Sequence, residues 1–172
     1  MIDWKIWQPQ QRANLLFILR GDEILLIRKK RGFGAGKING PGGKVDPGET
    51  ALESALRETE EELGVRPLDA ELRGELHFQF SDGFSLQCAV FLATDFEGEP
   101  HETEEAIPLW TPLDAIPYDE MWADDRHWLP LLLRGETFAG YFEFADEVLL
   151  HRRIELKSPG KLDSLGEIPA AQ

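Results

Sequence analysis

The chain has 172 residues, 42% of them hydrophobic and 29% charged, which is typical of one globular domain and excludes a disordered or fibrous protein. Its formal net charge of −14 excludes a nucleic-acid polymer as partner, because a phosphate backbone is bound through many Lys and Arg side chains. No apolar run is long enough for a secretory signal or a membrane-spanning helix, and the single cysteine, Cys88, fits a reducing compartment, so we expect a cytoplasmic monomer.

The first half of the chain predicts a hairpin, a loop and a helix. Two apolar runs, residues 14–20 and 23–28, are separated by Gly21 and Asp22, which indicates a β-hairpin. Residues 32–43 include six glycines in twelve positions, so this loop is able to approach a ligand closely. The helix that follows begins with a capping box, Thr50 with Glu53, and ends at Gly64.

The second half predicts strands around one further helix. Residues 72–80 and 84–93 form a second hairpin around Ser81-Asp82-Gly83, with Phe78 and Phe80 on one face. Further elements are expected as a short strand at 106–111, a helix at 126–134, strands at 137–144 and 147–156, and a loose tail at 157–172. We therefore expect one domain over residues 1–156.

Basic residues gather in one segment. Residues 28–44 hold six Lys or Arg and no acid, although the chain as a whole is acidic. This segment either attracts an anionic ligand or balances an acidic helix, and charge alone does not decide between them.

The helix carries an unusual group of acids. Glu58, Glu61 and Glu62 are at i, i+3 and i+4, so their like charges lie on one helix face and repel. A hard divalent cation bound through oxygen would offset this repulsion, and Arg57 would orient a carboxylate by pairing with Glu49 or Glu61. From spacing alone, a metal site and a solvated acidic face remain equally open.

The same stretch resembles the Nudix box. Gly43 and Glu49 are followed by Arg57-Glu58-Thr59-Glu60-Glu61-Glu62-Leu63-Gly64-Val65, with Thr59 where the family usually has an aliphatic residue. The resemblance implies an α/β/α sandwich with a mixed β-sheet that hydrolyses a nucleoside diphosphate linked to a further group. It also implies Mg²⁺ as cofactor, with Mn²⁺ as a substitute, held by the Gly42 carbonyl, Glu58, Glu61, Glu62 and Glu105.

A wider likeness covers residues 12–156. The segments from Lys29 to Lys44 and from Met121 to Leu133 look like those of the MutT-related oxidised-purine nucleoside triphosphate hydrolases of mammalian type. Ile38 and Pro41 stand where those enzymes have aromatic residues, and Asn14 where a Thr is usual. The likeness implies that Asn39, Asp124 and Asp125 bind the purine edge and Trp122 stacks on it, that Asn14, Phe33, Phe78, Phe80 and Leu86 wall the pocket, and that Lys29, Pro41, Gly42, Gly43 and Lys44 approach the sugar or phosphates.

Two adjacent aspartates have a physical use in a base pocket. Carboxyl groups held close together and partly desolvated do not both ionise, so the pair both donates and accepts hydrogen bonds. The alternative is that Asp124 and Asp125 cap the following helix. For Trp122, the alternative is an ordinary place in the hydrophobic core or an interface. For Glu105, the alternative is an ordinary place in a solvated, charged loop.

These observations predict hydrolysis of oxidised purine nucleoside triphosphates, such as 8-oxo-dGTP or 2-hydroxy-dATP, to the monophosphate and pyrophosphate. The alternatives are a Nudix hydrolase for a methylated purine nucleotide, ADP-ribose or a dinucleoside polyphosphate, and a non-catalytic nucleotide sensor. Isoprenoid isomerisation is disfavoured because Cys88 lies in an expected strand away from the box.

Overall fold

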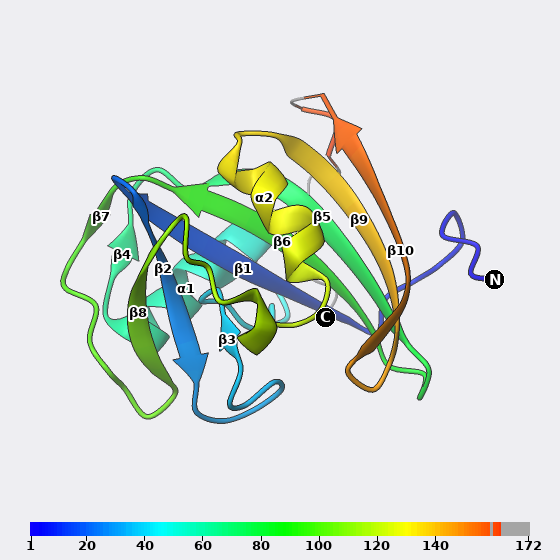
Figure 1. The fold of residues 1–172 in the computed structure, drawn as a ribbon, viewed down its shortest axis with the longest axis horizontal. Helices are drawn as coiled ribbons and strands as arrows, with labels where there is room; N and C mark the ends of the chain where they lie inside the picture. Colours follow the sequence, from blue (N-terminus) through cyan, green and yellow to red (C-terminus); the bar gives the residue numbers. More distant parts are fainter. Residues whose placement is uncertain (159, 163–172) are drawn as a thin grey trace.

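A computed structural model describes residues 1–158 and 160–162 (Figure 1). Its elements, in chain order, are β1 (Gln11–Arg20), β2 (Glu23–Lys29), β3 (Ile38–Asn39), α1 (Ala51–Leu63), β4 (Arg66–Pro67), β5 (Glu71–Phe80), β6 (Ser85–Ala93), β7 (Phe96–Glu97), β8 (Ala106–Pro112), the 3₁₀-helix η1 (Tyr118–Glu120), α2 (Asp125–Leu133), β9 (Thr137–Ala145) and β10 (Val148–Lys157).

Most strands join one mixed sheet. Its order is β10-β9-β5-β6-β1-β2-β3, and β8 also pairs with β2. β1 runs parallel to β6 from Gln11 to Ile18, but it pairs with β2 only at Leu19 and Arg20, next to the turn. The predicted hairpin is therefore confirmed, but its two strands diverge away from Gly21.

The glycine-rich segment fills the space between the diverging strands (Figure 1). The β3 residue Asn39 pairs with β2, while the carbonyls of Pro41 and Gly43 accept hydrogen bonds from the backbone of β1 at 2.8 and 2.9 Å. A loop rich in basic residues is thereby held against the middle of the sheet.

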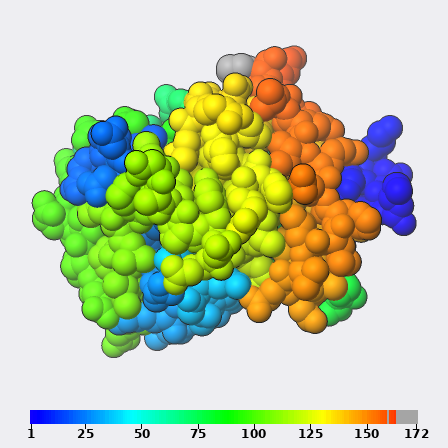
Figure 2. All heavy atoms as spheres, in the orientation of Figure 1, coloured from blue at the N-terminus to red at the C-terminus, as the bar shows by residue number. Residues whose placement is uncertain are grey.

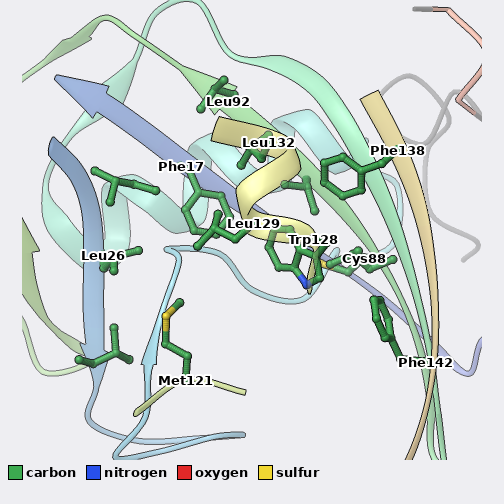
Figure 3. Close-up of a cluster of buried hydrophobic side chains, with 14 of the residues drawn as sticks. Phe17, Leu26, Cys88, Leu92, Met121, Trp128, Leu129, Leu132, Phe138 and Phe142 are labelled. Atoms are coloured by element: carbon green, nitrogen blue, oxygen red, sulfur yellow. The ribbon is translucent and has the colours of Figure 1, made fainter. Parts of the chain in front are cut away.

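The two α-helices cover opposite faces of the sheet. Alternating residues of β1 divide between them, because successive side chains of a strand point to opposite faces. Leu16 and Ile18 belong to the core beneath α1, and Phe17 packs with Trp128 and Leu129 of α2 (Figure 3). Complete burial of a leucine such as Leu129 stabilises the fold by about 1.5–3 kcal/mol. This layering confirms the predicted α/β/α sandwich.

The residues before β1 also pack on the sheet. Trp4 lies 5.3 Å from Tyr141 of β9 between ring centroids, and the Trp7 indole N–H donates to Gln79 of β5 at 2.8 Å. The N-terminal segment therefore lies beside the β9–β10 end of the molecule (Figure 2).

The predicted strands and helices are confirmed within a few residues, and the capping box at Thr50 and the left-handed Gly64 (φ 76°) are both present. The sequence missed β3, β4, β7 and η1, since elements of two or three residues carry no periodicity. Within the described residues, no helix is long and apolar enough to cross a membrane. The expected loose tail lies largely outside the described residues.

Candidate active site

A cavity of about 340 Å³ opens between the glycine-rich segment, the strands β1, β5, β6 and β9, and the start of α2. Glu62 of α1 and the turn at Gly42, which bond to each other, line one part of it, and the buried Asp124 and Asp125 line another. We call these parts the phosphate end and the base end, after the groups that the resemblance leads us to expect there. The predicted residues that line the cavity are Asn14, Lys29, Phe33, Asn39, Gly42, Gly43, Lys44, Glu62, Phe78, Phe80, Leu86, Trp122, Asp124 and Asp125.

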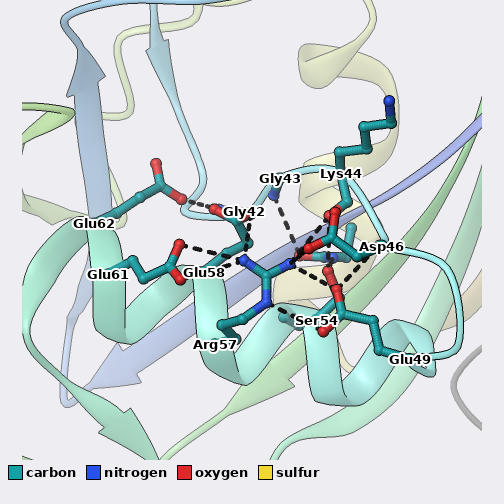
Figure 4. Close-up of polar contacts among 12 residues, drawn as sticks. Gly42, Gly43, Lys44, Asp46, Glu49, Ser54, Arg57, Glu58, Glu61 and Glu62 are labelled. Carbon is teal, nitrogen blue, oxygen red and sulfur yellow. Dashed lines mark hydrogen bonds and ion pairs between the residues drawn. The ribbon is translucent and has the colours of Figure 1, made fainter.

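Arg57 lies at the centre of the group of carboxylates next to the phosphate end (Figure 4). Its Nε and Nη2 donate to both carboxylate oxygens of Glu49, at 3.1 and 2.6 Å. Its Nη1 donates to Glu58 at 3.0 Å and to Glu61 at 3.2 Å. The hydrogen bond from Arg57 lowers the pKa of Glu49, and the same bond raises that of Arg57. The expected pairing of Arg57 with Glu49 and Glu61 is confirmed.

Two glycines let the carboxylates of α1 approach the turn. A Cβ at Gly43 would lie 2.5 Å from the Glu58 carboxyl carbon, and a Cβ at Gly42 would lie 2.0 Å from the Asn14 carbonyl oxygen. The Gly42 N–H donates to Glu62 at 2.9 Å. Glycine is therefore required at both positions by the close approach of α1 and β1.

Glu62 differs from the other acids of the helix because it is buried, with 2% of its surface exposed. Burial raises the pKa of Glu62 to about 8, although the bond from Gly42 and the charge of Lys29 act against the rise. Burial also raises the pKa of Glu58, which keeps its contact with Arg57. Glu61 is half exposed.

Glu105 reaches the same end from the loop before β8. Its carboxylate accepts from Arg31 at 3.2 Å, and its charge contributes to the raised pKa values of Glu58 and Glu62. It therefore lies within electrostatic reach of the helix acids, as a position for a further ligand requires.

The base end holds two acids buried at 2% and 4% exposure, Asp124 and Asp125. Asp124 accepts a hydrogen bond from Trp128 Nε1 at 2.7 Å, and its side chain makes no capping bond to α2. Burial raises the pKa of Asp124 to about 6. Burial and the charge of Asp124 raise the pKa of Asp125 well above its usual range. The two buried carboxyl groups therefore hold a proton more strongly than free ones do, and a pair that shares one proton both donates and accepts hydrogen bonds.

Aromatic rings wall the base end. Trp122 and Phe33 are stacked at 5.1 Å with 10° between their planes, and Phe80 meets both rings edge-on. Gly34 permits this stack, since a Cβ there would lie 2.9 Å from Trp122 Nε1. The ring expected to stack on a purine is thus already paired with Phe33.

Several predicted positions differ in detail. Among the described residues, five predicted site residues do not line the cavity, and their expected roles stay predictions: Pro41, Arg57, Glu58, Glu61 and Glu105. Asn14 lines the cavity but also bonds to Ser54 of α1 at 2.8 Å. Cys88 lies in a strand as expected, yet it lines the cavity below the aspartates, and burial raises the pKa of its thiol.

The sequence also missed part of the lining, namely Gln11, Ala13, Leu15, Ile27, Gly40, Phe84, Cys88 and Phe144. Phe144 of β9 lies opposite Phe80 of β5, and Cys88 follows Leu86 by two residues in β6, so each shares a face of the sheet with a predicted residue. Predicting this from the sequence would require the order of the strands.

The NUDIX domain model matches residues 9–132 of this chain. The chain belongs to the NUDIX family. It is 42% identical over 147 residues to the Danio rerio protein named oxidized purine nucleoside triphosphate hydrolase, with 84% of this chain and 94% of the relative covered. The Mus musculus protein of that name is 42% identical over 135 residues, with 78% and 86% covered. A solved MutT structure from Bacillus halodurans superposes with a TM-score of 0.77 at 30% identity, covering 84% and 97% of the two chains.

Membership of the NUDIX family implies a divalent metal cofactor, and the phosphate end fits one. Its donors are carboxylate oxygens, the ligands that hard divalent cations prefer. Among the described residues, no three acidic, His or Cys side chains are grouped so that they could hold a metal ion, and Arg57 pairs with Glu58 and Glu61. A complete protein cage is not needed, since Mg²⁺ keeps water and phosphate oxygens among its ligands.

Proposed function

We propose that this chain hydrolyses oxidised purine nucleoside triphosphates, such as 8-oxo-dGTP or 2-hydroxy-dATP, to the monophosphate and pyrophosphate. The observation that carries this proposal is a cavity that joins Glu62, on the acidic face of α1, to a group of aromatic rings and a buried aspartate pair whose pKa values are raised. Its volume of about 340 Å³ is in the range of ligand pockets. The names of the Danio rerio and Mus musculus relatives support the same substrate class.

At the base end, the proton of Asp125 and the lone pairs of Asp124 supply a donor and acceptors for a purine edge. The edges of 8-oxo-guanine and 2-hydroxy-adenine differ, and a pair that shares one proton is able to match both. Asn39 adds a neutral amide, and the Phe33 and Trp122 rings supply apolar faces. These groups orient the nucleotide so that its phosphates extend toward α1.

At the phosphate end, the Gly42 carbonyl and Glu58, Glu61, Glu62 and Glu105 are the proposed ligands of Mg²⁺, with Mn²⁺ as a substitute. The ion would neutralise charge on the phosphates and leaving pyrophosphate. Lys29 faces Glu62 in the same cavity and adds a positive charge for a phosphate. A water oxygen attacks in line, the bond between the α- and β-phosphates breaks, and one of these glutamates takes the water proton.

A panel of nucleotides tests the substrate class. Pyrophosphate release is measured for 8-oxo-dGTP, 2-hydroxy-dATP, a methylated purine triphosphate, dGTP and dATP, with and without Mg²⁺, and ADP-ribose and a dinucleoside polyphosphate are tested for hydrolysis. We expect metal-dependent release with the largest kcat/KM for the oxidised purines. If another compound has a larger kcat/KM, that compound is the substrate and the proposed oxidised purines are not. If no compound is hydrolysed, the result favours a nucleotide sensor.

The remaining proposals concern the molecule as a whole. We propose one functional domain over residues 1–156, a monomeric state and a cytoplasmic location. Burial of Cys88 in the cavity wall is compatible with a reducing compartment, because the structure uses this thiol as an apolar side chain.

A further inference from the structure

The hydroxyl of Thr103 lies between two of the proposed metal ligands. Thr103 Oγ1 donates to the backbone carbonyl of Glu62 at 2.7 Å, and it accepts from the backbone N–H of Glu105 at 3.2 Å. Glu62 is near the end of α1, and Glu105 is in the loop before β8, 43 residues later. One side-chain oxygen thus connects two glutamates that are far apart in the chain.

Other bonds hold the loop but do not connect these two residues. Lys30 of the segment after β2 donates its backbone N–H to Glu105 and its ammonium to Thr103, both at 2.9 Å. His101 donates its N–H to Leu63 at 3.0 Å. These contacts place the loop against β2 and the helix end, while the Thr103 hydroxyl links the backbones of Glu62 and Glu105 directly.

Thr103 also has a purely structural role. The last four carbonyls of a helix lack partners within the helix, and the Thr103 hydroxyl satisfies the carbonyl of Glu62. That role alone would affect stability and would not require the same oxygen to accept from Glu105. The second bond gives the hydroxyl the geometry of an outer-shell group, which fixes ligands without touching the ion.

We propose that Thr103 is a positioning residue that sets the place of Glu105 relative to Glu62 and thereby the divalent-cation affinity of the phosphate end. This inference rests on the proposed metal ligands. It assigns no contact with substrate to Thr103, whose effect is transmitted through the backbone of Glu62 and Glu105.

The test measures Mn²⁺ binding without nucleotide, by the loss of the free-ion signal in electron paramagnetic resonance. Thr103→Val keeps the shape of the side chain and removes both bonds, so we expect about tenfold weaker Mn²⁺ binding. Thr103→Ser keeps the hydroxyl and should bind within about twofold of the wild type. Thr111→Val is the matched control, since within the described part of the chain its hydroxyl bonds to the Leu109 carbonyl in β8 and to neither glutamate.

The Thr103→Val substitution made in a Glu105→Gln variant distinguishes an effect on the position of Glu105 from an effect on stability. In Glu105→Gln, the Thr103→Val change should weaken Mn²⁺ binding by less than it does in the wild type, because its effect acts through Glu105. The midpoint of thermal unfolding is recorded for each variant. Equal loss of affinity in Thr103→Val and Thr111→Val, or an unchanged affinity in Thr103→Val, overturns the inference.

The same data distinguish this inference from the proposed function. If the wild type binds Mn²⁺ and Glu62→Gln does not, the metal site stands whatever Thr103 does. If the wild type binds no Mn²⁺ with or without a nucleotide, both the proposed metal site and the proposed role of Thr103 are wrong. At saturating Mn²⁺, the KM of Thr103→Val for nucleotide should equal that of the wild type.

Discussion

The two ends of the cavity use the same chemical group under opposite conditions. At the phosphate end, Glu49, Glu58 and Glu61 surround Arg57 and are partly open to solvent. At the base end, Asp124 and Asp125 are buried and lie among aromatic rings and Trp128. The guanidinium of Arg57 lowers the pKa of Glu49 and opposes the effect of burial on the pKa of Glu58, whereas burial raises the pKa of both aspartates. Surroundings, not residue type, therefore decide how strongly each carboxyl group holds its proton.

Glu62 has features of both ends. It belongs to the acidic face of α1, yet it is as buried as the aspartates, and burial raises its pKa to about 8. Its backbone is tied to Thr103 and its side chain to the turn at Gly42. Glu62 is thus the acid of the helix with the least freedom to move, which suits a ligand whose position must be fixed before a substrate arrives.

Replacement of Glu62 tests the phosphate end and has the largest expected effect. Glu62→Gln keeps the size of the side chain but cannot become the carboxylate that a metal ion binds, so kcat should fall by about 10²–10⁴-fold. The unfolding midpoint should change little, because Gln still accepts from Gly42. Glu60→Gln, on the exposed side of the same helix, is the control and should keep its activity.

Glu58→Gln should show a loss of similar size. Full activity in both the Glu58 and Glu62 variants would refute the assignment of α1 as the metal-binding element. A loss confined to Glu62 would instead narrow the set of proposed ligands.

Replacement of Asp125 tests the base end and should affect recognition more than chemistry. Asp125→Asn removes the O–H donor and offers an amide in its place, so kcat/KM for the oxidised purines should fall about 5–150-fold, equivalent to roughly 1–3 kcal/mol. Mn²⁺ binding without nucleotide should be unchanged. Asp119→Asn, an exposed change in the preceding 3₁₀-helix, is the control. An equal loss for every nucleotide, including pyrimidines, would contradict a role in reading the base.

The phosphate end was largely predictable from the sequence. Thr50, Glu53 and Gly64 fix the ends of α1 through local hydrogen bonds, so the spacing of Glu58 and Glu62 already places them on one helix face. The distinction between these glutamates was not predictable. Burial of Glu62 depends on the turn at Gly42, which is held by β1 and not by the helix.

The base end was predictable only through resemblance. Phe144 lines the cavity because β9 runs parallel to β5, with Phe144 opposite Phe80, and Cys88 does so because β6 pairs with β5. No local pattern gives the order of strands in a sheet. The alternative of Asp124 as a helix cap was also locally reasonable, and Asp124 does stand at the N-cap position of α2, but its side chain accepts from Trp128 and makes no capping bond.

The smallest expected effect is on the pH dependence of stability, and it follows from the burial of Asp124 at the base end. Asp124 has a pKa of about 6 in the folded chain and about 3.8 when unfolded, so the folded state binds more protons between these values. The stability that this group contributes is complete below about pH 4 and is lost as the pH rises through about 6. Asp124→Asn does not ionise and still accepts from Trp128, so it avoids that loss.

The unfolding midpoint of Asp124→Asn minus that of the wild type should therefore be more positive at about pH 7.5 than at about pH 4.5, by a few degrees. All other titrating groups are common to the two proteins, so they cancel in the difference unless they interact with Asp124. Asp125 does interact, and its hydrogen bond favours the ionised form of Asp124, so it reduces the expected change without reversing its sign, because burial is the larger effect. Asp119→Asn should give a constant difference across this range. A constant difference for Asp124→Asn as well would mean that the aspartate pair is solvated, and the contrast between the two ends would then disappear.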